Sequence, residues 1–344
     1  MNLDDFKKLD SSFELVGLEK DFFEISTISH ITEPRDGSFV FAKSSKFIER
    51  AGEKLDRDGF IKTAIILEKK LADSLDKQAL IDLKVKFGWL ATVESVAVSM
   101  TKYSKIFYDK KFSHLNYFVD GRQMGSAHID SSAQIAQDVF IGCDVTIGQD
   151  VVIMPGVKIL PNVIIGAGTI IFPNTVIYPY SSIGKNCRVH ASVTIGADGF
   201  GYSFHQGEHC KIWHFGGVEI SDEVEIGANS TIDAGGFYPT RIGAGTKIDN
   251  HCTVGHNAQL GQGIIVCGQG AIAGSVEMSD FSVMGGRAGI GPDVRVGEGA
   301  QIAAGAIVSE GSIVKAGEVL AGHPARPLRE WLKGLAFIRN SSLK

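Results

Sequence analysis

Two histidines in the segment DNHCTVGHNAQ, His251 and His256, have the residue type and setting that proton transfer needs. An imidazole exchanges protons near neutral pH and can act as a general base when a polar neighbour orients its ring. The same segment offers three such neighbours, Asp249, Asn250 and Asn257. We expect these three residues to crowd one corner of the fold with the histidines and to support an imidazole there.

A zinc site is the competing interpretation of these histidines. Their spacing resembles part of the ligand set of γ-class carbonic anhydrases, in which three histidines from adjacent subunits hold zinc. A third ligand would have to come from His190 or from a loop histidine, and that family has no N-terminal domain of this size. The five cysteines show no CxxC spacing and so indicate neither zinc nor a disulfide framework. We predict no bound metal and no cofactor, with a zinc lyase as an alternative.

The elements that must position these residues are indicated by an aliphatic residue at every sixth position. A period of six fits neither an α-helix nor a flat strand, but it is typical of hexapeptide repeats that stack as a parallel β-helix. A smaller residue follows four positions later, as Val139, Cys187 and Cys252 do, so both registers should face inward. Glycine often follows the large aliphatic directly, where a corner needs a positive φ angle or close approach of backbones. The large aliphatic positions are Ile129, Ile135, Ile141, Ile147, Ile153, Ile159, Ile165, Ile171, Ile177, Ile183, Val189, Ile195, Ile220, Ile226, Ile232, Ile242, Ile248, Val254, Leu260, Val266, Ile272, Met278, Met284, Ile290, Val296, Ile302, Val308, Val314 and Leu320.

The chain is predicted to be mainly β and to divide into three parts. Only five of its 41 glycines precede Gly121, which favours an α/β domain over residues 1–120 before the β-helix of residues 127–322. Within the first part, residues 38–42 and 63–67 look like strands, and residues 45–55 and 90–108 have helical patterns. Residues 323–344 form a C-terminal helical extension, which we expect to cap the open end of the last coil.

Two breaks interrupt the six-residue period, and excursions from a rigid scaffold often carry function. The first separates Ile195 from Ile220 by 25 positions, and the second separates Ile232 from Ile242 by ten. The first excursion is rich in glycine, histidine and aromatic residues. A plain surface loop that shields a coil edge is the alternative.

Charge and hydropathy exclude several classes of function. A net charge of −5 with no basic stripe gives no electrostatic footprint for nucleic acid. The start of the chain, MNLDDFKKLD, is too acidic for a signal peptide, and no apolar run is long enough to span a bilayer. These features favour a cytoplasmic protein without a membrane segment.

Four segments, in this order on the hexads, resemble the UDP-3-O-acylglucosamine N-acyltransferase family of lipid A and lipopolysaccharide biosynthesis: GADGFGY (196–202), STIDAG (230–235), KIDNHCTVGHNAQLG (247–261) and IAGSVEMSDFSVMGG (272–286). The similarity extends to EPRDGSFVFAKSSKF (33–47), which resembles that family's uridine-binding segment. The resemblance covers most of the chain. It implies a left-handed β-helix, a homotrimer and active sites at the subunit boundaries.

The resemblance also implies roles for single residues. His256 would be the general base, Phe41 and Phe47 would stack on the uracil, and Ser44 would stand where an Asn usually bonds to it. The implied reaction moves an acyl chain, a 3-hydroxyacyl chain in our expectation, from acyl carrier protein to the 2-amine of a UDP-3-O-acylglucosamine. The carrier's pantetheine arm would lie in the cleft between two parallel β-helices.

At four positions the chain departs from the family pattern. Ser44 and Phe47 replace an Asn and a Tyr, Ala234 replaces the Arg of TIDRG, and Asp293 stands where a second His is usual. The identity of the nucleotide sugar and the acyl chain length are therefore left open. The alternatives are a divergent paralogue that acylates another nucleotide amino sugar, the zinc lyase described above, and a scaffold without catalysis.

Overall fold

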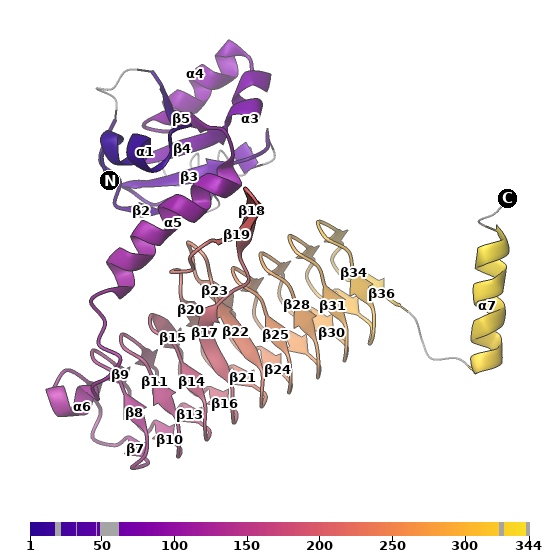
Figure 1. Cartoon of the computed structure of the whole chain (residues 1–344). Coiled ribbons are helices and arrows are strands. Elements are labelled where there is room, and N and C mark those ends of the chain that lie inside the picture. The colour runs from indigo at the N-terminus through magenta and orange to yellow at the C-terminus, as the bar shows by residue number, and fades with distance from the viewer. Residues whose placement is uncertain (18–21, 32, 46, 49–61, 323–326, 342–344) are drawn as a thin grey trace.

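The computed structural model describes residues 1–17, 22–31, 33–45, 47–48, 62–322 and 327–341. It confirms the predicted fold class, because a parallel β-helix follows an N-terminal α/β region and precedes a C-terminal helix (Figure 1).

The N-terminal region is built on a five-stranded sheet with the order β1-β5-β4-β3-β2. Strands β2 to β5 run parallel to their neighbours, and β1 pairs antiparallel with β5 at one edge. The inner strands read SFVFA, TAIILE and LATV, and such apolar runs are typical of strands that are covered on both faces. The elements are α1 (Leu3–Leu9), β1 (Glu14–Val16), β2 (Thr27–Ile28), β3 (Ser38–Ala42), β4 (Thr63–Glu68), α3 (Lys69–Ser74), α4 (Lys77–Lys86), β5 (Leu90–Val93), α5 (Val96–Phe112) and α6 (Gly121–Met124).

The prediction of a helix over residues 90–108 is wrong for its first residues. Residues 90–93 form the buried strand β5, and the helix α5 begins only at Val96. Ser95 marks the boundary, because its side chain accepts a hydrogen bond from the Val98 backbone N–H and caps the new helix. Most of the helix predicted over residues 45–55 lies outside the described residues.

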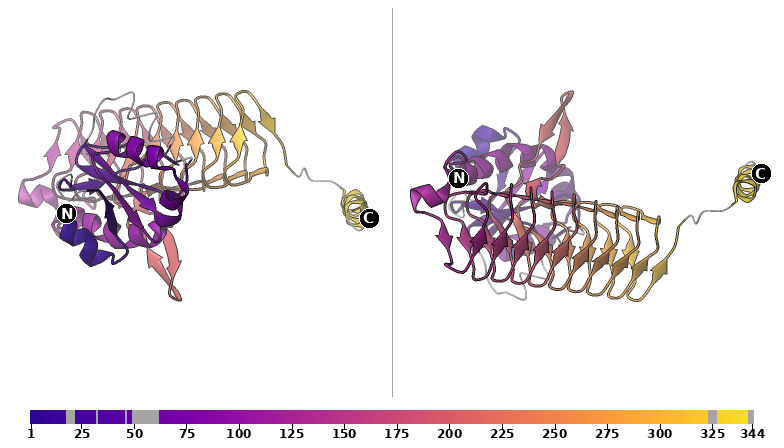
Figure 2. Two further views of the ribbon diagram at one scale, coloured as in Figure 1. Left: turned by 90° about the horizontal axis from the view of Figure 1, so that it is seen from above. Right: turned by 90° about the horizontal axis from the view of Figure 1, so that it is seen from below.

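The β-helix consists of three parallel sheets of ten, nine and ten strands, which form the faces of a triangular solenoid (Figures 1 and 2). The first sheet contains β6 (His128–Ile129), β9 (Thr146–Ile147), β12 (Ile164–Ile165), β15 (Ser181–Ile183), β20 (Val218–Ile220), β23 (Thr240–Ile242), β26 (Gln259–Leu260), β29 (Glu277–Met278), β32 (Arg295–Val296) and β35 (Ile313–Val314). The second contains β7 (Gln134–Ile135), β10 (Val152–Ile153), β13 (Ile170–Ile171), β16 (Arg188–Val189), β21 (Glu225–Ile226), β24 (Lys247–Ile248), β27 (Ile265–Val266), β30 (Val283–Met284), β33 (Gln301–Ile302) and β36 (Val319–Leu320). The third contains β8 (Phe140–Ile141), β11 (Lys158–Ile159), β14 (Val176–Ile177), β17 (Thr194–Asp198), β22 (Thr231–Ala234), β25 (Thr253–Val254), β28 (Ala271–Ile272), β31 (Gly289–Ile290) and β34 (Ile307–Val308).

Both predicted inward registers are confirmed by burial. The large aliphatic residues form one continuous core, and the smaller register lies beside them, with Val139, Cys187 and Cys252 each at most 2% exposed. Two buried threonines of the small register are satisfied by the following part of the coil, because Thr169 donates to the Gly184 carbonyl and Thr246 to the Gly261 carbonyl. The solenoid core is therefore closed without unpaired threonine hydroxyls at these positions.

Apart from Gly196, whose φ is 85°, the glycines that follow the large aliphatics serve close approach rather than positive φ. A Cβ on Gly166 would lie 2.6 Å from the carbonyl carbon of Gly184 in the next coil. The left-handed conformation occurs at other corner positions, such as Asn162, Tyr180 and Asn257 with φ near 60°. At such corners the glycine provides space, and the left-handed turn is made at another position.

The N-terminal region packs on the first half of the solenoid through α5 and the two excursions (Figure 1). Lys111 donates to the Phe215 carbonyl at 2.7 Å, and Tyr180 donates to the Lys111 carbonyl at 2.6 Å. Phe215 and Phe237 belong to the aromatic core of the N-terminal region, although both come from the β-helix part of the sequence. The two parts therefore share a core.

The predicted C-terminal helix is present as α7 (Leu328–Ser341), but it does not cap the last coil. No side chain of α7 is buried, and the helix stands apart from β36 (Figures 1 and 2). In the part of the chain that the structure describes, we find no helix with the length and hydropathy to cross a membrane.

Candidate active site

The candidate site lies along one edge of the solenoid, where the strands of the third sheet end. Both excursions leave the solenoid at this edge, the first after β17 and the second after β22. The first contains the hairpin of β18 (Tyr202–His205) and β19 (Glu208–Lys211), which projects from the body of the molecule (Figure 2). His256 follows β25 at the same edge, one coil beyond the second excursion. Both excursions therefore leave the solenoid at the edge that carries His256.

His256 is half-buried, and its ring is oriented by Asn257. The Nδ1 atom of His256 lies 3.0 Å from Oδ1 of Asn257. That amide is itself fixed, because its Oδ1 accepts from the Gly236 N–H and its Nδ2 donates to the Tyr238 carbonyl. Since a carbonyl oxygen only accepts, Nδ1 of His256 must carry the hydrogen. Nε2 is then left with a free lone pair, as a general base requires.

Two glycines leave room for the His256 ring. A Cβ on Gly199 would lie 2.5 Å from Cβ of His256, and a Cβ on Gly274 would lie 2.5 Å from its Nε2 atom. Gly199 comes from the first excursion and Gly274 from the next coil. The imidazole is therefore packed tightly from both sides, with Nε2 directed toward the coil that follows.

A cavity of about 370 Å³ brings the predicted catalytic and nucleotide-binding residues together. Phe41 and Phe47 from the N-terminal region line it together with His256, Asn257 and Asp293. Ser44 is not among the residues that line this cavity, and its backbone carbonyl accepts from the Phe47 N–H instead. Phe41 and Phe47, two of the three residues predicted to contact the nucleotide, therefore line this cavity.

Asp249 and Asn250 do not share the corner of His256, contrary to the sequence-based expectation. Asp249 accepts hydrogen bonds from the Asn250 and Gly268 backbone N–H groups, and both residues line a separate hollow with His251. One hexad spans one face of the triangle, so residues six positions apart lie on neighbouring corners. His251 and His256 are separated for the same reason.

The candidate third zinc ligand also lies on the other corner. His190 lines a hollow with Asp249 and Asn250, and its ring stacks on Phe172. Over the described ranges, no cluster of three or more His, Cys, Asp or Glu side chains is arranged to hold a metal ion.

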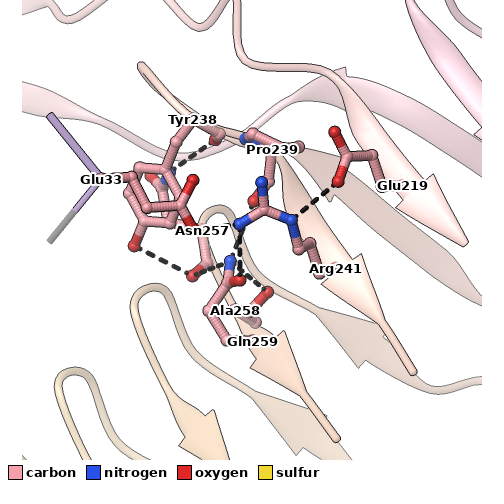
Figure 3. Close-up of polar contacts among 8 residues, drawn as sticks. All are labelled: Glu33, Glu219, Tyr238, Pro239, Arg241, Asn257, Ala258 and Gln259. Atoms are coloured by element: carbon pink, nitrogen blue, oxygen red, sulfur yellow. Dashed lines mark hydrogen bonds and ion pairs between the residues drawn. The ribbon is translucent and has the colours of Figure 1, made fainter. Parts of the chain in front are cut away.

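Sequence reasoning missed a polar network that joins the N-terminal region to the site (Figure 3). Arg241 forms ion pairs with Glu33 and with Glu219, and it also donates to Gln259. Tyr238 donates to the Asn257 carbonyl at 3.2 Å, so the second excursion is tied to the corner of His256. No periodic signal marks these residues, because Tyr238 lies in a break of the hexad pattern and Glu33 pairs with a residue far along the chain.

Burial shifts the protonation of two further groups near the edge. The pKa of His214 falls to about 4, mainly because burial disfavours its charged form and secondarily because His256 is close. The pKa of Asp233 rises to about 6, mainly through burial and secondarily through the nearby carboxylate of Asp198. His214 is therefore neutral near pH 7.

Comparison with known proteins identifies the repeats and a group of similar proteins. The bacterial transferase hexapeptide family (six repeats) matches residues 138–172 and 162–197. UDP-3-O-acylglucosamine N-acyltransferase 2 from Rhodopseudomonas palustris (strain BisB18) is 41% identical over 160 residues, which are 46% of this chain and 42% of that protein. The UDP-3-O-acylglucosamine N-acyltransferase of Helicobacter hepaticus (strain ATCC 51449 / 3B1) is 42% identical over 151 residues, 44% of this chain and 46% of that protein.

The matched part spans less than half the length of these curated relatives. Among solved structures, a UDP-N-acetylglucosamine acyltransferase from Campylobacter jejuni superposes with a TM-score of 0.42 at 29% identity, covering 54% of this chain and 66% of that one. The curated relatives confirm the resemblance seen in the sequence motifs over the part of the chain that they match. The chain contains hexapeptide repeats of the bacterial transferase type and is similar in sequence to UDP-3-O-acylglucosamine N-acyltransferases.

Proposed function

We propose that this chain is an acyltransferase that moves an acyl group to the 2-amine of a UDP-3-O-acylglucosamine. The observation that carries the proposal is the His256 imidazole, whose Nδ1 is held by Asn257 and whose Nε2 is free. It lines the same cavity as two aromatic side chains of the N-terminal region. The curated relatives are named for this acyl transfer.

The proposed donor is an acyl thioester on acyl carrier protein. The acceptor nitrogen attacks the thioester carbonyl, a C–N bond forms, and the C–S bond breaks with the sulfur as leaving group. Nε2 of His256 accepts the proton that the amine loses and can return it to the departing thiolate. A positioned base typically contributes about 10²- to 10⁴-fold to the rate of such a step.

Phe41 and Phe47 are the proposed contacts to the uracil ring. Phe47 is half-buried at the cavity, and the ammonium of Lys43 lies 5.8 Å from its ring centroid. Phe41 is more firmly held, because its ring stacks on Tyr103 and meets Phe39 edge-on. Ser44 does not line the cavity. It is therefore a proposed contact to a part of the ligand that extends beyond this cavity.

The active form is proposed to be a homotrimer with its sites at the subunit boundaries. Exposed aliphatic side chains on the solenoid faces support association, among them Ile164, Ile265 and Ile307. A neighbouring copy would then supply one wall of the groove for the pantetheine arm.

A second candidate is acyl transfer to a different nucleotide amino sugar. Asp293 supports this alternative, because it lines the cavity of His256 as an acidic group where the similar family usually has a second histidine. A carboxylate there would favour an acceptor that presents a cationic or hydroxyl group at that point.

An acyl-transfer assay with acyl carrier protein and a panel of UDP-sugars tests the proposal. We expect turnover with a UDP-3-O-acylglucosamine, and His256→Ala should lower kcat by about 10²- to 10⁴-fold with little change in melting temperature. His251→Ala is the matched control, since that histidine is exposed on the neighbouring corner and should have little effect. Equal losses in both variants, or full activity in both, would contradict the role of His256.

A further inference from the structure

His214 lines two cavities at the same edge of the solenoid. It lines the cavity of His256, and it also lines a second cavity of about 500 Å³. The walls of the second cavity come from α5, the segment after it and the corners of earlier coils, and they include Tyr108, Phe112, Tyr117, Tyr178 and Asp198. His214 is therefore the side chain that borders both spaces.

The backbone around His214 is held from two sides. Trp213 donates its N–H to the Ser104 side chain on α5, and Phe215 donates its N–H to the Gly236 carbonyl in the second excursion. A Cβ on Gly201 would lie 2.7 Å from Cε1 of His214, so this glycine makes room for the ring. The imidazole is therefore fixed in place without a bound ligand.

One ring nitrogen of His214 makes no hydrogen bond with the described residues. His214 is 2% exposed, and its Nδ1 atom has no hydrogen-bond partner among the described residues. Its ring meets that of His256 edge-on, with centroids 5.0 Å apart. A neutral imidazole has one donor and one acceptor nitrogen, and leaving such an atom buried and unpaired is unfavourable. The free nitrogen is thus suited to a polar group of a ligand that lies next to His256.

We propose that His214, which borders both cavities, is a substrate-binding residue whose Nδ1 atom forms a hydrogen bond with the acceptor. The ligand group is an uncharged hydrogen-bonding group, such as a hydroxyl or an amide carbonyl. The bond fixes the acceptor beside Nε2 of His256, while the aromatic second cavity takes the part of the acceptor that extends past His214. This inference rests on the proposed function for the identity of the acceptor.

A buried histidine that only fills space would give a different result from a histidine that binds the acceptor. His214→Phe keeps the ring and removes both nitrogens. His214→Asn keeps a polar atom near the position of Nδ1, whereas His214→Gln places one near Nε2. The probe is UDP-3-O-acylglucosamine, with its affinity for the full chain measured by calorimetry and the melting temperature measured alongside.

We expect His214→Phe to weaken binding about tenfold or more, and His214→Asn to stay within about threefold of the wild type. His214→Gln should bind less well than His214→Asn. If His214→Phe proves unstable, the comparison of Asn with Gln still tests the role of Nδ1. Wild-type affinity in the Phe variant, or equal affinity in the Asn and Gln variants, would overturn the proposal.

Two controls separate this inference from the proposed function. His205→Phe changes an exposed histidine on the β18–β19 hairpin and should leave binding unchanged. His256→Ala should still bind the acceptor but fail to turn it over. A wild-type chain that does not bind UDP-3-O-acylglucosamine would reject the proposed function, whereas normal wild-type binding with an unaffected Phe variant would reject only the role of His214.

Discussion

The side-chain oxygen of Asn257 lies 3.0 Å from Nδ1 of His256 and accepts a hydrogen bond from the Gly236 N–H as well. One buried amide therefore holds the proposed base and the second excursion at once. Catalytic geometry and loop geometry are coupled through this residue, and substitutions there should affect both.

Asn257→Leu should lower kcat about 10-fold or more, because the tautomer of His256 is no longer fixed. The melting temperature should also fall, since the Gly236 N–H and the Tyr238 carbonyl lose a buried partner. Steady-state kinetics and thermal unfolding measure the two effects. Asn250→Leu is the control, because Asn250 caps the Ala228 N–H on the neighbouring corner and its loss should change stability alone.

Gly274→Ala should impair activity with little effect on the fold. The new Cβ would lie 2.5 Å from Nε2 of His256, and the three nearest atoms all belong to that ring. The ring can move aside, so we expect kcat to fall about 10²-fold, as for other small displacements of a catalytic group. Gly289→Ala in a later coil meets its first neighbour only at 3.8 Å and should remain active. An active Gly274→Ala enzyme would argue against Nε2 as the base.

Phe47→Ala should weaken the binding of UDP-sugars by roughly 1 to 3 kcal/mol, by analogy with the stacking of bases on aromatic side chains. Titration calorimetry with UDP provides the measurement. Phe41→Ala should lower the melting temperature more than Phe47→Ala does, because the Phe41 ring packs against Phe39 and Tyr103 in the aromatic core. Unchanged affinity in Phe47→Ala would assign this ring to packing only.

Asp233→Asn should stabilise the chain at alkaline pH and leave it unchanged near pH 4. The pKa of Asp233 is raised to about 6, so the folded state holds the proton more tightly than the unfolded state does. Ionisation therefore costs stability as the pH rises above 3.8, and the cost is complete above about 6. We expect a gain of roughly 1 to 3 kcal/mol at pH 8 in urea unfolding. Asp138→Asn, at an exposed position of the solenoid, is the control for the change of carboxylate to amide.

Light scattering should give a particle of three times 36.9 kDa, as expected for a homotrimer. Ile307 and Ile313 are 81% and 69% exposed on the solenoid, and such apolar side chains favour burial against another copy. A stable monomer would remove the shared site at the subunit boundary.

The fold could be predicted because its signal is strictly periodic. Each large aliphatic of the series faces the core for the same reason, so the six-residue period predicts the solenoid from Ile129 to Leu320 outside the two breaks. The N-terminal region has no such period, and its error at residues 90–93 shows that LATV fits a helix or a strand until the cap at Ser95 is recognised.

The site could be predicted only in part. His256 and Asn257 are adjacent in sequence, so their contact survives any error in the placement of coils. Asp249 and Asn250 are near His256 in sequence, but they lie at the neighbouring corner because one hexad spans a whole face of the triangle. His214 and Tyr238 lie in the two breaks, where no period places a residue, and their positions depend on contacts with α5 and with Asn257.

The shared aromatic core affects the order in which parts of the chain can fold during synthesis. Phe6 and Phe107 pack in the same cluster as Phe215 and Phe237, so the N-terminal region cannot complete its core when its own last strand and helix leave the ribosome. It must wait until much of the solenoid has been translated, whereas each coil needs only its neighbours. A nascent chain that stalls before Phe215 therefore exposes part of this aromatic cluster, the kind of surface that recruits chaperones or aggregates.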